Sequence, residues 1–215
     1  MPMSRRTLLA GTLVAGVAAI GLRRWSAGGN DGSSSSTSPL IVRLQPLGPR
    51  LADAAVARAA ATLREYFGAD ADVLPVRPLP DIAYYPPRGR YRADRLLDVL
   101  AQQPATPGTY LLGLTAVDIS WTKGDHTDWG VLGLARIGGR VGVVSSYRCG
   151  AASVGQDRAS ERFGKVAAHE LGHCLGLAHC ASAGCIMRDA ESRVATVDDS
   201  RLLCPQCRGR VAIPG

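Results

Sequence analysis

The chain has 215 residues, of which 46% are hydrophobic and 20% charged, and its formal net charge is +7. The first 27 residues hold four arginines and no acid, so the remainder carries 21 basic and 18 acidic groups. This remainder has no basic stripe interleaved with aromatic residues, which argues against nucleic acid as a partner. About 177 residues follow position 38, enough for one domain with a sizeable core and too few for two.

Residues 1–27 have the three-part form of a bacterial export signal. Residues 4–9 read Ser-Arg-Arg-Thr-Leu-Leu, an Ala- and Gly-rich apolar run extends to Leu22, and Arg23-Arg24 follow. The adjacent arginines favour the twin-arginine type. The apolar run is shorter than the ~20 residues of a transmembrane helix. We expect export to the periplasm or cell exterior, or membrane association through an uncleaved N-terminal segment, because no clear cleavage site follows.

Residues 28–38 are a Gly/Ser-rich spacer, and the folded domain is expected to span residues 39–215. Hydrophobic periodicity predicts strands and helices along it. The predicted strands are 40–44, 72–76, 110–115, 130–135 and 140–145. The predicted helices are 51–67 and 93–102, followed by a helix that carries the histidines, and the prolines at 78, 80, 86 and 87 indicate irregular structure. This order predicts an α+β domain, a twisted mixed β-sheet backed by helices.

Three of the four histidines fall within eleven consecutive residues, 169–179. His169 and His173 are one helical turn apart and can face the same ion. Gly176 can end the helix at a positive φ, so that His179 returns as a third ligand. Three imidazoles leave one tetrahedral position of a zinc ion open to water, which is typical of a catalytic site. Glu170 is placed to accept the proton of that water.

Four cysteines form two closely spaced couples, Cys180 with Cys185 and Cys204 with Cys207. This spacing is typical of a closed structural zinc site. Two disulfides are the alternative, although a Cys-x-x-Cys couple is cramped for a bridge within itself.

The pattern His-Glu-x-x-His-x-x-Gly-x-x-His-Cys-x4-Cys-x-Met with a later Cys-x-x-Cys resembles the archaemetzincins, a family of metzincin metalloproteases. The resemblance covers residues 39–215. It implies a single compact metzincin-like domain with an active-site helix, a small C-terminal subdomain around the four cysteines, and two Zn²⁺, one catalytic and one structural. It also implies that Met187 lies in a tight turn forming an apolar floor beneath the metal ligands, and that a substrate strand pairs with the edge strand Trp129–Ala135.

The remaining candidates have two interpretations each. Cys174 is expected to face the core, and Cys149 is either inert or its disulfide partner. His126 is either an exposed loop residue or a substrate contact at the rim of the site.

The predicted reaction is hydrolysis of a peptide bond, with Glu170 as general base and acid. The partner is then a peptide or protein substrate, and we expect a monomer. The alternative function is an exported zinc-binding protein of metzincin fold that acts as a binding or structural module with little or no catalysis.

Overall fold

The computed structural model describes residues 39–191 and 193–211, so the predicted signal (1–27) and spacer (28–38) lie outside the described residues. Within the described ranges, no helix is both long enough and apolar enough to cross a membrane.

The strands form two sheets. The five-stranded sheet has the order β2-β1-β5-β9-β8, and all neighbours are parallel except β8, which is antiparallel to β9 and lies at the edge. The four-stranded sheet has the order β3-β4-β6-β7. The strands of the first sheet are β1 (Ile41–Leu47), β2 (Asp70–Val73), β5 (Thr109–Thr115), β8 (Gly133–Ala135) and β9 (Val141–Ser145). Those of the second are β3 (Tyr84–Tyr85), β4 (Arg90–Arg92), β6 (Ile119–Lys123) and β7 (His126–Val131).

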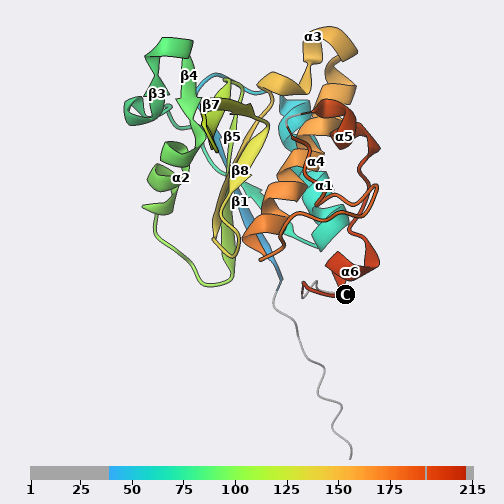
Figure 1. The fold of residues 1–215 in the computed structure, drawn as a ribbon. Coiled ribbons are helices and arrows are strands. Elements are labelled where there is room, and N and C mark those ends of the chain that lie inside the picture. Colours follow the sequence, from blue (N-terminus) through green and yellow to red (C-terminus); the bar gives the residue numbers. More distant parts are fainter. Residues whose placement is uncertain (1–38, 192, 212–215) are drawn as a thin grey trace, which may run out of the picture. The chain divides into compact units, whose positions relative to one another are not determined.

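Helices cover both faces of the five-stranded sheet (Figure 1). Helices α1 (Asp53–Phe67) and α4 (Gln156–Cys174) share one core with Leu112 and Val144, whereas α2 (Ala93–Ala101) packs with Leu111 and Val143. Because neighbouring residues of a strand point to opposite faces, strands β5 and β9, whose residues are nearly all buried, serve both cores. The short elements are η1 (Asp81–Ala83), η2 (Pro86–Arg88), η3 (Tyr147–Cys149), α3 (Ala151–Val154), α5 (Val194–Asp199) and α6 (Pro205–Arg208).

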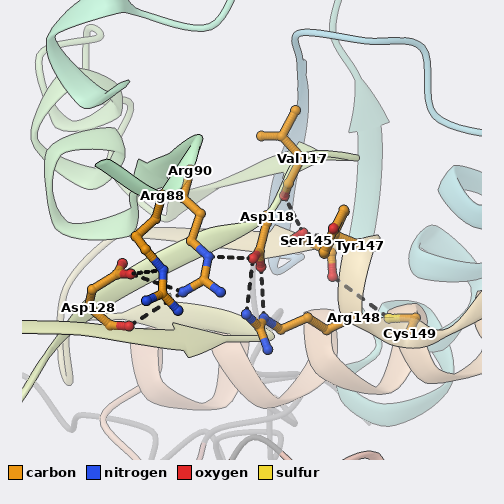
Figure 2. A network of polar contacts seen from close by, with 9 residues as sticks. All are labelled: Arg88, Arg90, Val117, Asp118, Asp128, Ser145, Tyr147, Arg148 and Cys149. Carbon is orange, nitrogen blue, oxygen red and sulfur yellow. Dashed lines mark hydrogen bonds and ion pairs between the residues drawn. The ribbon is translucent and has the colours of Figure 1, made fainter. Parts of the chain in front are cut away.

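An ion-pair network fastens the second sheet to the first (Figure 2). The carboxylate of Asp118, just before β6, accepts two hydrogen bonds from Arg148, at 2.7 and 3.0 Å, and contacts Arg90 of β4 at 2.7 Å. Arg90 also contacts Asp128 of β7 at 3.1 Å. Since Arg148 follows β9, this network fixes the β6–β7 hairpin relative to the strands that lead into α4.

The predicted elements agree with the observed ones for β1, α1, α2, β5 and β9 within a few residues. Two predicted strands were wrong in their bounds, and one sheet was missed. The second strand is Asp70–Val73 rather than 72–76. Residues 130–135 are not one strand: β7 ends at Val131 in one sheet and β8 begins at Gly133 in the other. The four-stranded sheet was not predicted, because its strands are short and its residues are largely polar.

The C-terminal segment after α4 is held to that helix by a second ion pair. Arg162 of α4 donates to both carboxylate oxygens of Asp198 at 2.7 Å and to the carbonyl oxygen of Cys149 at 2.8 Å. The hydrogen bonds that Asp198 accepts from Arg162 lower the pKa of its carboxyl group to about 2. Because the folded-state pKa is depressed, the stabilisation is present above the ordinary pKa of Asp and is lost as the pH falls through about 2.

We therefore expect Asp198→Asn to lower the free energy of unfolding at pH 7 by roughly 2 kcal/mol or more, because Arg162 stays buried without its counter-charge. Urea unfolding at a series of pH values measures this. The difference in unfolding free energy between wild type and Asp198→Asn should disappear as the pH falls from about 4 to 2. The control is Asp199→Asn at the exposed neighbouring residue, which should leave the free energy of unfolding nearly unchanged. An equal loss in both variants would contradict the assignment.

Candidate active site

The C-terminus of α4 shapes the site. The helix ends at Cys174, and Gly176 has φ 92°. The N–H of Gly176 donates to the carbonyl of His173, and that of Leu177 to Gly172, both at 2.9 Å, which is the Schellman pattern. The turn places the carbonyl of Leu177 within 2.8 Å of Nδ1 of His173. The same backbone reversal brings the chain back so that His179 faces the helix.

The three predicted histidine ligands come together. One ligand atom of each of His169, His173 and His179 lies within 4.8 Å of the other two. The ring centroids are 4.6 Å apart for His169 and His173, 5.4 Å for His169 and His179, and 4.9 Å for His173 and His179. The three rings thus surround one point at the end of α4.

The hydrogen bonds of these rings fit a metal ion. Nδ1 of His169 donates to the carbonyl of Ile186 at 2.7 Å, and Nδ1 of His173 donates to that of Leu177. In the neutral form of each ring this leaves Nε2 without a proton, and the two Nε2 atoms lie 3.0 Å apart. Burial, and next the neighbouring His173, lower the pKa of His169 to about 3. Burial also lowers the pKa of His173. Two neutral lone pairs directed at one point suit a divalent cation such as zinc.

Glu170 lies beside this point in a confined position. Its side chain is buried, and burial raises its pKa to about 8; a bound cation would lower that pKa. The carboxylate packs against the backbone of β8: a Cβ atom placed on Gly133 would lie 2.5 Å from Oε1 of Glu170. The carboxylate therefore occupies space that only a glycine at position 133 leaves free.

We expect Gly133→Ala to displace the Glu170 carboxylate and to lower kcat at least about tenfold, with little change in zinc content. A small misplacement of a reacting group costs much of the rate. The measurement is steady-state kinetics with metal analysis, and Gly209→Ala, at φ −67° and with its Cβ 3.5 Å from the nearest atom, reports the general cost of an added methyl group. Unchanged kinetics in Gly133→Ala would show that Glu170 has room to move.

Met187 lies fully buried beneath the histidine-bearing helix. A Cβ atom on Gly172 would overlap its Sδ atom. The residue before it, Ile186, supplies the carbonyl that orients His169. The backbone carbonyl of Met187 accepts the N–H of Cys180 at 2.8 Å. The turn that carries Met187 therefore connects the histidine cluster to the cysteine cluster.

The four cysteines 180, 185, 204 and 207 also converge. Their Sγ atoms all lie within 4.8 Å of one another, and those of Cys180 and Cys204 are 3.8 Å apart. That separation is far longer than a disulfide bond, and the cysteines are free thiols. Backbone N–H groups point at the sulfurs, from Ser182 to Cys180 at 3.4 Å and from Cys204 to Cys185 at 3.5 Å. Four converging sulfurs with such support fit a structural zinc ion.

The remaining candidates, Cys149, Cys174 and His126, belong to neither cluster. Cys149 and Cys174 are both buried, both are free thiols, and burial raises the pKa of each to about 12, so they are inert. The disulfide alternative for this pair was wrong. His126 begins β7 rather than lying in a loop; it is exposed and its ring lies 5.3 Å from that of Trp129.

A groove of about 420 Å³ runs past the histidines. Its walls are the β6–β7 hairpin, residues 131–135, helix α4 and the segment from Ile186 to Ser200. The sequence did not predict that Trp121, Lys123 and Arg188 line this groove. The Gly124–Asp125 pair between two β-branched or aromatic stretches is a hairpin signal that could have placed Trp121 and Lys123.

A groove bounded by an edge strand, with a buried acid and three imidazoles at its floor, defines a zinc metallopeptidase. The comparisons with known proteins agree. A model of peptidase family M54 matches residues 83–212, and the chain belongs to this family.

The similarity to relatives and to solved structures covers most of the chain. An archaemetzincin of Halobacterium salinarum is 32% identical over 162 residues, which cover 72% of this chain and 90% of the relative. The crystal structure of archaemetzincin from Archaeoglobus fulgidus, complexed with malonate, has a TM-score of 0.67 at 31% identity and covers 80% of this chain and 99% of that one. The Methanopyrus kandleri structure has a TM-score of 0.69 at 31% identity, covering 82% and 95%. The predicted family and fold class are confirmed.

Proposed function

We propose that the chain is a peptidase with two zinc ions, in which His169, His173 and His179 hold the catalytic one and Cys180, Cys185, Cys204 and Cys207 the structural one. The observation that supports this most is the approach of the two Nε2 atoms of His169 and His173 to 3.0 Å, while each Nδ1 lies at hydrogen-bond distance from a backbone carbonyl. A cation between the two neutral rings would accept the lone pairs of both Nε2 atoms, which suits their close approach. Bound at the histidines, zinc supplies Lewis acidity that polarises a carbonyl and makes water acidic near neutral pH.

Glu170 is the general base and then the general acid. Its carboxylate accepts a proton from the attacking water as the water oxygen bonds to the scissile carbonyl carbon. It then delivers a proton to the amine nitrogen as the C–N bond breaks. Confinement by Gly133 keeps the carboxylate in one position, which limits the reorganisation needed during both transfers.

The substrate is proposed to lie along β8. This strand pairs with β9 on one side and ends the five-stranded sheet on the other, and its residues line the groove. An extended peptide can add to such an edge through backbone hydrogen bonds, which position it without reading its sequence. The sequence predicted that the whole segment Trp129–Ala135 pairs with the substrate. We propose that only Gly133–Ala135 does so, because β7 belongs to the other sheet. Export by the N-terminal segment and a monomeric state remain part of the proposal.

The proposal is tested by incubating the purified protein with a mixed peptide library and mapping the products by mass spectrometry. We expect cleavage that stops on removal of zinc with a chelator and returns on addition of zinc. Positions of cleavage also separate an endopeptidase from an exopeptidase. A fully metallated protein that leaves every peptide intact would favour the alternative, a zinc-binding module without catalysis.

A further inference from the structure

The groove past the histidines has six charged side chains in its walls besides the histidines. The cations are Lys123, Lys165 and Arg188, and the acids are Glu170, Asp189 and Glu191. Whether the groove prefers a charged substrate depends on which of these are already compensated by neighbours.

Both lysines already have acceptors or a counter-charge within the protein. The ammonium group of Lys165 lies 3.3 Å from the Glu161 carboxylate and donates to the carbonyls of Val197 at 3.3 Å and Asp198 at 3.1 Å. Its three N–H donors therefore have three acceptors. The ammonium group of Lys123 lies 3.8 Å from the carboxylate of Asp189 and over the ring of Trp129.

The acids other than Glu170 are also paired with basic side chains. Asp189 contacts Lys123 and also Nδ1 of His179, at 3.6 Å. Glu191 is paired with Arg193 at 3.1 Å. Glu170 is buried against β8 and is assigned to catalysis.

Arg188 differs from all of these. It directly follows buried Met187, and its backbone N–H is fixed to the carbonyl of Cys185 at 3.0 Å, so its place on the groove wall is set by the same turn that orients His169. Its side chain is exposed. Within residues 39–191 and 193–211, its guanidinium makes neither a hydrogen bond nor an ion pair.

We propose that Arg188 is a specificity residue that binds a carboxylate of the peptide substrate, either an Asp or Glu side chain or the α-carboxylate of the chain end. A guanidinium group can hold a carboxylate through two parallel hydrogen bonds, and Arg188 lines the same groove as the three histidines, so a substrate held there lies in the groove of the reacting groups. This inference rests on the proposed function of the same groove.

The test measures binding rather than cleavage, in zinc-loaded protein carrying Glu170→Gln. Short N-acetylated peptides are titrated calorimetrically in matched pairs: Glu against Gln at each position, and a free against an amidated C-terminus. Charge-assisted hydrogen bonds predict a preference of about tenfold to a hundredfold for the carboxylate member of one pair. Loss of the Glu preference with Arg188→Gln would identify the side chain as the ligand, and loss of the free-acid preference would identify the α-carboxylate.

Controls separate this role from a general charge effect. Arg201→Gln removes an exposed arginine that does not line the groove and should leave the preference unchanged. Arg188→Lys should restore part of it, because a lysine keeps the charge without the paired donors. Equal affinity for both members of every pair in the Glu170→Gln protein, or a preference that survives Arg188→Gln, would overturn the inference. Neither result affects the proposed function, which the peptide library tests separately through cleavage by the wild-type protein.

Discussion

Replacing Glu170 by Gln should lower kcat for peptide cleavage about a thousandfold or more while the protein keeps its zinc. The amide has nearly the volume of the carboxylate, so it fits the space beside Gly133, but it cannot accept a proton from water. General acid–base catalysis contributes about 10²–10⁴-fold, and here one group acts in both proton transfers. The measurement is kcat and KM on the best library peptide, with zinc determined on the same sample.

The matched control for this variant is Asp157→Asn, which neutralises an exposed acid in the first turn of the same helix that does not line the groove. It should retain kcat within a few-fold. Residual cleavage equal to that of wild type in Glu170→Gln would assign the activity to another group or to a contaminant, and would remove the basis for the proposed mechanism.

Replacing Cys204 by Ser should have the largest effect on stability. The variant loses one of four sulfurs around the structural zinc, and apparent binding free energies of structural zinc are about 10–16 kcal/mol. Cys185, Ile186 and Met187 are consecutive, and Ile186 orients His169. We therefore expect a fall in the free energy of unfolding of several kcal/mol, together with weaker retention of the catalytic zinc.

The two other cysteines provide the control for that experiment. Cys149→Ala and Cys174→Ala each remove a buried thiol that is not part of the cluster. Each should cost about 1 kcal/mol, as expected for a small buried apolar group, and each should leave the zinc content unchanged. Thermal unfolding and metal analysis of the three variants measure this. Similar losses in all three would mean that the cluster stabilises the fold by packing alone.

The sequence predicted the histidine cluster well because the cluster is local. His169 and His173 are brought together by a helical turn, and Gly176 reverses the chain for His179, so the distances depend on backbone geometry within eleven residues. The four cysteines are spread over more of the sequence, but the short spacing within each couple is typical of zinc sites and therefore predicted their convergence.

The groove could not be predicted in the same way because its walls come from distant segments. Tyr91 pairs with Ile119, and Lys123 meets Asp189, contacts that no local periodicity encodes. The apolar run from Val131 to Ala135 looks continuous, and only the pairing of Val131 with β6 and of Gly133 with β9 shows where the chain changes sheets. Which charges in the groove are compensated follows from these tertiary contacts.

The central claim is that three imidazoles hold one zinc ion beside Glu170. X-ray diffraction from crystals of the purified, fully metallated protein, recorded above and below the zinc absorption edge, tests it most directly. The account predicts one anomalous peak between His169, His173 and His179 and another among the four clustered cysteines. A map with no peak between the three histidine rings would contradict it.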